Sequence, residues 1–427
     1  MIKRMFKKLL PVIEVAALFI LLVACGRQMS EEEIQTEAED IHAQAWVVDT
    51  HLDSPSLHIR NPEWIAEERH VRRESRSGGY PMGRRWNHLW DIPRMIEGGA
   101  DAVFLAVAHG QWALNEEEYT WAKSNAIASF DWIHAMTDAS PNANLALSVA
   151  DAERLHRSGK RAIFIGVENG YPIGTDIANV EDFYNRGMRY MTLSHAGDNQ
   201  ICASSIIIDQ DREDFGLTHF GREVVGELNR LGIMIDCSHI SKKTFFDVIE
   251  ITRAPVIASH SAVNGINDHV RNFSDEMLLK LKENNGVIQL CPLTNFIRAV
   301  PEIPERDAAL ADLAEEFGDM QNATDELQQE YRAREREINI WYPIPVATMD
   351  DFIKCIDYAV NLIGIDHVGF GSDFDGGGSI AGLEDISQLP NLTVELLRRG
   401  YSSRDIEKFW GGNLLRVFRE VENTAGN

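Results

Sequence analysis

Short apolar runs recur along the chain, and nearly all of them end at or next to a histidine or a carboxylate residue. Seven of the eight runs are separated from the next one by a stretch with helical period or clear helix signals. This alternation predicts an α/β fold, a (β/α)8 TIM-type barrel of parallel strands. The predicted strands are residues 46–51, 101–108, 161–168, 190–195, 233–239, 255–260, 286–293 and 367–374.

In such a barrel the carboxyl ends of the strands form one face, which collects residues that lie far apart in the sequence. The polar residues at these predicted ends would therefore share one pocket. Histidines and carboxylates in one pocket are typical of a metal site. The residues are His51, Asp53, Glu168, His195, His239, His260 and Asp373.

Three predicted strand ends suggest how two ions could be held. His51 and Asp53 are two residues apart, so in an extended segment their side chains point the same way and can bind one cation. Glu168 ends a run too apolar for an unpartnered carboxylate, and its two oxygens could bridge two ions. His239 and His260 end adjacent strands, about 4.8 Å apart, and could converge on a second ion. The alternatives are a surface pair for His51 and Asp53, an arginine salt bridge for Glu168, and structural roles for the histidines.

The resulting arrangement places one ion on His51, Asp53 and Glu168, and a second ion on Glu168, His239 and His260. Each ion would have room for a shared water, and paired metals lower the pKa of that water enough to give hydroxide at neutral pH. Nitrogen and oxygen ligands without sulfur suit zinc, and they also suit manganese and cobalt.

Two insertions should border the barrel mouth and act as lids or substrate walls. Residues 61–90 follow the first strand and are rich in Arg, Gly and Trp without a clear period. Residues 301–345 follow the seventh strand and contain an acidic, helix-favouring run between prolines. The second insertion could equally be a solvated helical hairpin or the contact of a homodimer.

The first 25 residues read as a targeting segment that is removed from the folded domain. A basic start precedes the apolar run 15–24, which is too short for a comfortable membrane span. The sequence around Cys25 resembles the lipobox of bacterial lipoproteins, in which the cysteine is acylated. Residues 26–40 are polar, as a tether would be, and the domain would occupy residues 41–427. The alternative is an uncleaved anchor or an ordinary signal peptide.

This reading places the protein outside the cytoplasm, anchored by lipid to a bacterial membrane. The residue after Cys25 is Gly26, whereas an aspartate at this position would resemble an inner-membrane retention signal. The glycine therefore favours the periplasmic face of the outer membrane in a Gram-negative cell. A net charge of -25 over 427 residues argues against nucleic acid as a partner. The four other cysteines have no C-x-x-C spacing and leave disulfide pairing open; they are Cys202, Cys237, Cys291 and Cys355.

Beyond these separate signals, the chain resembles the membrane dipeptidases, also called renal dipeptidases, a family of zinc peptidases with a barrel fold. The likeness runs from about Trp46 to Glu422. It rests on the order and spacing of several short motifs rather than on any one of them. The motifs are His51-Leu52-Asp53, Gly166-Val167-Glu168, Leu193-Ser194-His195, Ile235-Asp236-Cys237-Ser238-His239, Ser259-His260-Ser261, Arg271-Asn272, the run 367–376 and the run 413–418.

The resemblance implies two Zn²⁺ ions on the five ligands already derived, and it adds three roles. His195 would donate a proton to the developing oxyanion, and Arg271 would bind the terminal carboxylate of the substrate. Asp373 would transfer protons and help hold the substrate amino group. His195 and Asp373 are thus the expected catalytic residues, and both bind substrate together with Arg271.

The function that follows is a binuclear zinc dipeptidase that hydrolyses dipeptides with a hydroxide held between the metals. D-configured or otherwise unusual C-terminal residues would be accepted. The alternatives are a related amidohydrolase acting on acyl amino acids or on a secreted peptide metabolite, and a lipoprotein that serves binding or maturation with little catalysis. The two insertions border the predicted pocket and leave the specificity open.

Overall fold

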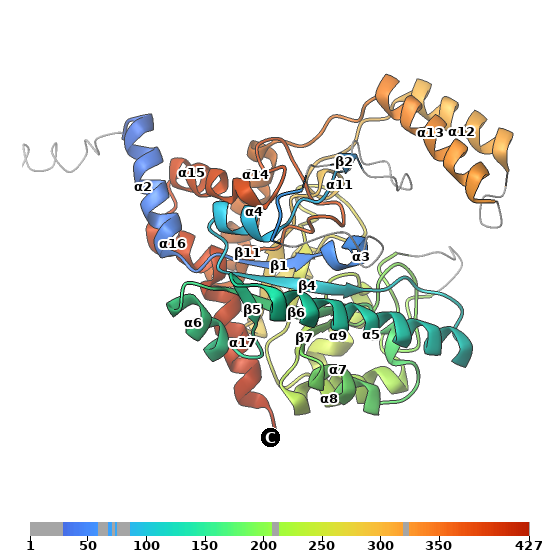
Figure 1. The fold of residues 1–427 in the computed structure, drawn as a ribbon, viewed down its shortest axis with the longest axis horizontal. Coiled ribbons are helices and arrows are strands. Elements are labelled where there is room, and N and C mark those ends of the chain that lie inside the picture. Colours follow the sequence, from blue (N-terminus) through green and yellow to red (C-terminus); the bar gives the residue numbers. More distant parts are fainter. Residues whose placement is uncertain are drawn as a thin grey trace, which may run out of the picture.

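Eight parallel strands form a barrel in the order in which they occur along the chain, which confirms the predicted (β/α)8 fold (Figure 1). The computed structural model describes residues 29–58, 67–70, 73–74, 86–206, 213–318 and 324–426. The strands are β1 (Val48–Leu52), β4 (Ala102–Ala108), β6 (Arg161–Glu168), β7 (Met188–Thr192), β8 (Met234–Asp236), β9 (Ile257–Ser261), β10 (Val287–Leu290) and β11 (Val368–Phe370). A further strand, β5 (Ala143–Leu145), pairs with β6 beside the barrel.

The barrel is closed between β1 and the segment that follows β11. Leu52 and Phe374 form a parallel bridge. The amide of Asp373 donates to the carbonyl of His51 at 3.1 Å, and the amide of Asp53 donates to the carbonyl of Phe374 at 3.0 Å. The closure therefore aligns the ends of the first and last strands, where three of the predicted site residues lie.

Helices surround the strands, and many begin at a serine, threonine, asparagine or aspartate whose side chain accepts an amide hydrogen bond. The helices between β1 and β9 are α3 (Ser54–His58), α4 (Ile92–Glu97), α5 (Glu116–Ala139), α6 (Val149–Arg157), α7 (Ala178–Asn185), α8 (His219–Leu231) and α9 (Lys242–Ile251). Those after β9 are α10 (Asp275–Glu283), α11 (Thr294–Ile297), α12 (Pro304–Phe317), α13 (Asp325–Trp341), α14 (Met349–Ile363), α15 (Leu389–Arg399), α16 (Ser403–Glu407) and α17 (Asn413–Thr424).

Aromatic side chains fill the barrel below the pocket. Phe418 of α17 lies 5.4 Å from Phe164 and 6.2 Å from Phe104, measured between ring centroids. Phe104 is in turn 5.4 Å from the ring of Tyr190, and all four rings are buried. This column connects the C-terminal helix to the floor of the predicted site, and its close packing should hold that floor rigid.

An N-terminal helix, α2 (Glu31–Gln44), precedes the barrel and packs against α15 (Figure 1). The polar segment 26–40, expected to be a tether, thus contains the first turns of a docked helix. Ile41 is buried against the core, and Nδ1 of His42 lies 2.7 Å from the Thr393 hydroxyl of α15. Glu31 pairs with Arg398 at 2.6 Å. The signal segment 1–25, with Cys25, lies outside the described residues.

The two insertions differ in how far the structure describes them. Residues 61–66, 71–72 and 75–85 of the first lie outside the described part of the chain. Its described residues include a short antiparallel pair, β2 (Arg73–Glu74) and β3 (Trp86–Asn87). In the second, α12 and α13 form a helical pair that projects from the barrel (Figure 1). This agrees with a helical hairpin, and a role in a homodimer stays a prediction. Within the described residues, no helix combines the length and apolar character needed to cross a bilayer.

Docking of α2 can be tested with Ile41→Ala. Truncating this buried side chain should lower the free energy of unfolding by about 2 to 4 kcal/mol, because a cavity remains between α2 and the core. Chemical denaturation followed by circular dichroism measures the change. Glu37→Ala on the exposed side of the same helix is the matched control and should change the value by less than about 0.5 kcal/mol. Equal stabilities of the two variants would contradict the docking.

Candidate metal centre

The predicted site residues emerge from the carboxyl ends of six strands. His51 and His260 lie within β1 and β9, and Glu168 is the last residue of β6. His239 lies three residues beyond β8, where its backbone adopts a left-handed conformation with φ of 69°. Asp373 lies beyond β11 with φ of 57°. Strands β7, β8 and β11 thus end before the predicted positions of His195, His239 and Asp373, and these three residues lie on the loops that follow.

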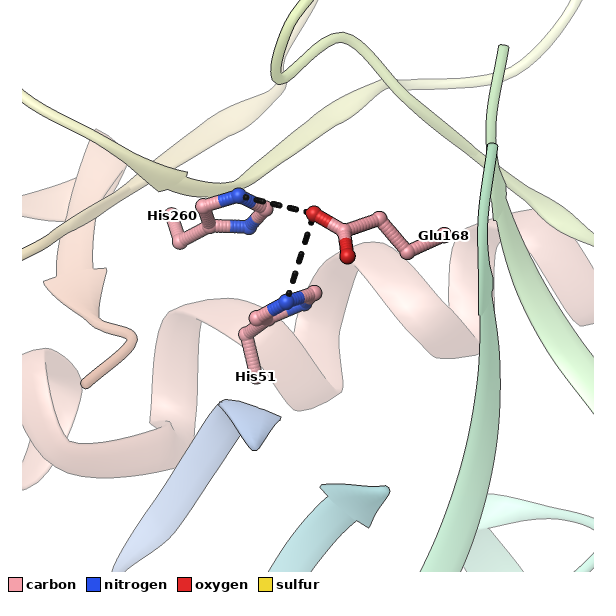
Figure 2. Close-up of side chains that lie close together, drawn as sticks. All are labelled: His51, Glu168 and His260. Atoms are coloured by element: carbon pink, nitrogen blue, oxygen red, sulfur yellow. Dashed lines mark ion pairs between the residues drawn. The ribbon is translucent and has the colours of Figure 1, made fainter. Parts of the chain in front are cut away.

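One carboxylate oxygen, Oε1 of Glu168, lies at the centre of the group (Figure 2). The Nε2 atoms of four histidines surround it within 3.7 Å. The distances are 3.1 Å for His239, 3.4 Å for His260, 3.6 Å for His51 and 3.7 Å for His195. Side chains from separate parts of the barrel therefore converge as the strand-end argument expects.

The ligand atoms form three groups in which every atom lies within 4.8 Å of the others. Glu168 belongs to two groups, which is the arrangement that a bridging carboxylate requires. The partition differs in detail from the one derived from the sequence, since His260 is grouped with His51, and His195 with His239. The groups are His51, Glu168 and His260; Glu168, His195 and His239; and His51, Asp53 and Asp373.

Burial of so many ionisable groups shifts their pKa values in opposite directions. Burial lowers the pKa of His239 and of His260, and burial together with the nearby Asp53 raises that of Glu168. Burial also disfavours charge on His51, but the carboxylates of Glu168 and Asp53 outweigh it and raise its pKa to about 10. Opposed shifts of this kind mark a cluster whose charges are not balanced by the protein alone.

These residues fit metal ions chemically. Neutral imidazole is the form that binds a metal, and the lowered pKa values keep His239 and His260 neutral at pH 7. Nδ1 of His51 lies 2.8 Å from the Tyr190 hydroxyl, while its buried Nε2 has no hydrogen-bond partner among the described residues. A cation bound there would displace the second proton that His51 carries at pH 7, and this nitrogen would then direct its lone pair to the cation.

The three residues with expected substrate roles lie around the same cluster. The His195 side chain is 34% exposed, yet the atoms around its imidazole desolvate it and lower its pKa to about 4. Arg271 is buried, stacks over the Phe296 ring at 5.4 Å, and donates to the carbonyl of His260 at 3.3 Å. Asp373 is grouped with His51 and the neighbouring aspartate. All three lie beside the cluster.

A second layer of polar residues under the cluster was not found from the sequence. Tyr190 contacts His51, Ser259 contacts His260, and Asp236 binds Ser259. The available signal was an aspartate inside the apolar run 233–239, where an ionisable side chain needs a partner. The four cysteines of the described part are free and buried: Cys202, Cys237, Cys291 and Cys355.

A closed parallel barrel with histidines and carboxylates at the C-terminal face defines a metal-dependent hydrolase. The family model for membrane dipeptidases, peptidase family M19, matches residues 35–427. The chain therefore belongs to the membrane dipeptidase family, and it is a metallopeptidase that hydrolyses peptide bonds.

Known relatives agree with this assignment. Dipeptidase tcpJ of Claviceps purpurea is 31% identical over 343 residues, which cover 79% of this chain and 70% of the relative. An uncharacterized dipeptidase of Schizosaccharomyces pombe is 34% identical over 63% of this chain, and the match spans 55% of its own length.

Solved structures show the same fold. The probable dipeptidase PvdM from Pseudomonas aeruginosa has a TM-score of 0.77 and 29% identity, covering 92% of this chain and 100% of that one. A metallopeptidase from Rhodobacter sphaeroides, liganded with a phosphinate mimic of the dipeptide L-Ala-D-Ala, has a TM-score of 0.67 and 22% identity over 88% of this chain and 99% of that one. The latter likeness concerns the fold.

Glu168→Gln tests the central position of this carboxylate. Replacing one oxygen by an amide removes a charge and a ligand atom, so metal content per chain and peptide hydrolysis should both fall. The loss of activity should exceed about 100-fold, the upper end for changes outside the ligand set. Elemental analysis and a turnover assay measure the two effects.

Glu181→Gln, an exposed carboxylate on α7, is the matched control and should behave as wild type. Near-full turnover of Glu168→Gln in a metal-loaded preparation would contradict the bridging role.

Proposed function

We propose that the protein is a binuclear zinc dipeptidase that cleaves the amide bond of dipeptides. The observation that carries the proposal is the position of Glu168, whose Oε1 lies within 3.7 Å of four imidazole Nε2 atoms and whose side chain belongs to two ligand groups. His51 and Asp53 on one side, and His239 and His260 on the other, would hold one ion each with Glu168 shared. The donor set contains nitrogen and oxygen without sulfur, which suits Zn²⁺.

The chemistry can be assigned to the residues around the ions. Bound Zn²⁺ ions lower the pKa of water and supply a hydroxide nucleophile at neutral pH. His195 is neutral at pH 7 because its pKa is lowered to about 4 by desolvation, so its N–H would stabilise the oxyanion as a hydrogen-bond donor. Asp373 would accept and return a proton, passing it to the departing amine.

Substrate length follows from two charged contacts. Arg271 would bind the C-terminal carboxylate with its planar guanidinium, and Asp373 would hold the free amino group. A longer peptide would lose one of these contacts, and an acyl amino acid has no amino group to offer. The phosphinate ligand of the Rhodobacter sphaeroides enzyme mimics a dipeptide with a D-configured C-terminal residue, which makes L-Ala-D-Ala a suitable probe.

A substrate panel tests the proposal. The Zn²⁺-loaded protein without residues 1–25 should hydrolyse L-Ala-L-Ala and L-Ala-D-Ala. It should cleave N-acetyl-L-alanine and tri-alanine at least about 100-fold more slowly, since each of these substrates lacks one charged contact. Amine release is the measurement. Preferred cleavage of the acyl amino acid would favour a related amidohydrolase, and no cleavage of any substrate would favour a binding or maturation role.

Arg271→Lys tests the role of this residue with the same substrates. The point charge of lysine cannot form two parallel hydrogen bonds, so KM for L-Ala-D-Ala should rise about 10-fold or more. The C-terminal amide of the same dipeptide lacks the carboxylate and should react equally slowly with wild type and variant. If wild type and variant have the same KM for L-Ala-D-Ala, Arg271 does not bind the C-terminal carboxylate of the substrate.

We also propose that residues 1–25 direct export and that Cys25 is acylated, which would place the barrel at the periplasmic face of the outer membrane in a Gram-negative cell. The basic start, the apolar run 15–24 and the lipobox-like sequence support this. Residues 26–30 would then connect the lipid to helix α2.

Metabolic labelling with a fatty-acid analogue tests the anchor. The full chain, expressed in a Gram-negative host, should incorporate the label and fractionate with the outer membrane. Cys25→Ser should lose the label, because the serine cannot form the thioether. Cys202→Ser is the control and should keep it, since that thiol is buried in the folded domain. A label retained by Cys25→Ser would exclude acylation at this position.

A further inference from the structure

Directly below the metal centre, the carboxylate of Asp236 is buried and accepts four hydrogen bonds. Its Oδ1 accepts from the amide of Ser238 at 3.0 Å and from the amide of Ser259 at 2.7 Å. Its Oδ2 accepts from the Thr192 hydroxyl at 2.5 Å and from the Ser259 hydroxyl at 2.6 Å. All four hydrogen bonds, from Ser238, Thr192 and twice from Ser259, are donated to Asp236, so its contacts are those expected of an ionised carboxylate.

The hydrogen bond between Asp236 and Ser259 fixes the tautomer of His260. A hydroxyl has only one proton, and Ser259 donates it to Asp236. Oγ of Ser259 also lies 2.9 Å from Nδ1 of His260, so in this second contact the hydroxyl must accept. The proton of neutral His260 is therefore on Nδ1, and its Nε2 presents a lone pair to the cluster around Glu168.

A separate argument applies to His51 and Tyr190. The Tyr190 phenol oxygen lies 2.8 Å from Nδ1 of His51, whereas the buried Nε2 of His51 has no hydrogen-bond partner among the described residues. In the neutral imidazole the proton is therefore placed on Nδ1, where the phenol oxygen accepts it. Nδ1 of His51 is then protonated, and its Nε2 is available to a metal.

Backbone packing leaves room for this connection. A Cβ atom at Gly166 would come within 2.0 Å of the Tyr190 ring, so only glycine lets the ring lie across β6. The ring is also held by the aromatic column below it, 5.4 Å from Phe104. The phenol is thus fixed beside His51 by the shape of the barrel.

We propose that Asp236, through Ser259, and Tyr190, by direct contact, are positioning residues that hold His260 and His51, respectively, as the tautomers that bind metal through Nε2. The inference rests on the proposed binuclear site, and it assigns roles to three residues that touch neither metal nor substrate. His239 approaches the network only on the metal side, where its Nε2 lies 2.9 Å from Nε2 of His260, while its Nδ1 has no hydrogen-bond partner among the described residues.

The test measures Zn²⁺ affinity rather than activity alone. Ser259→Ala and Tyr190→Phe each remove one hydroxyl from the network, and each should weaken binding of one Zn²⁺ by about 10- to 100-fold in a chelator competition. Asp236→Asn should weaken binding of the Zn²⁺ ion that His260 holds. The absorption spectrum of the Co²⁺-substituted protein should change with each variant, because ligand orientation changes.

Thr50→Val is the matched control. The Thr50 hydroxyl is also buried in the barrel and donates to the carbonyl oxygens of Ser259 and Phe370, at 2.7 and 3.1 Å, but contacts no histidine. This variant should keep the wild-type Zn²⁺ affinities and Co²⁺ spectrum. In the metal-free state, Ser259→Ala and Thr50→Val should unfold at similar denaturant midpoints, which separates metal positioning from general stability.

Wild-type Zn²⁺ affinities in both Ser259→Ala and Tyr190→Phe would overturn the inference, as would an equal loss of affinity in Thr50→Val. If Asp236→Asn does not fold, the other two variants still decide. A wild-type protein that binds Zn²⁺ but cleaves no dipeptide would overturn the proposed function, while a network-dependent affinity would still support the positioning role.

Discussion

The structure depends on one concentration of charge: a buried glutamate oxygen with four imidazole nitrogens around it. Oε1 of Glu168 lies 3.1 to 3.7 Å from these Nε2 atoms, in a region where burial raises the pKa of the carboxyl and lowers those of His239 and His260. Removing ionisable groups from water is costly unless partners replace the solvent. Bound cations can replace the solvent. The cluster whose burial costs free energy in the folded chain is therefore also suited to bind metal.

The barrel holds the residues of this cluster in place through packing beneath it and hydrogen bonds beside it. The aromatic column from Phe418 to Tyr190 fills the interior below it, and hydrogen bonds from Asp53 and Asp373 close the sheet beside it. Because His51, Glu168 and His260 project from strands, their spacing is set by the pairing of β1, β4, β6 and β9 with their neighbours, including a shift in register between Asp49 and Leu52 of β1. Packing, closure and ligand geometry are therefore parts of one arrangement.

The sequence is informative about this arrangement because strand ends carry a local signal. An apolar run followed by a histidine or carboxylate marks a residue at the barrel mouth, and Glu168 and His260 follow that rule directly. The early ends of β8 and β11 do not, since the left-handed turns at His239 and Asp373 leave no mark in hydrophobic periodicity. Helix α2 was not predicted from the sequence, because its exposed face is polar and the segment resembles a tether. The roles of Tyr190 and Asp236 depend on contacts between residues 23 to 139 positions apart in the sequence, which only the folded barrel brings together.

The positions of the remaining residues suggest how metal binding and substrate recognition are divided. His195, Arg271 and Asp373 lie on loops beyond β7, β9 and β11 rather than within strands. The loop after β7 is anchored to the loop after β8 beside the cluster: the Ser204 hydroxyl contacts the carbonyls of His195 and His239 at 2.5 and 3.3 Å. A loop held at its base but free at its outer part can change its contacts to substrate without moving the ligands. This separation explains how a fixed metal centre can coexist with the insertions 61–90 and 301–345 in a single barrel.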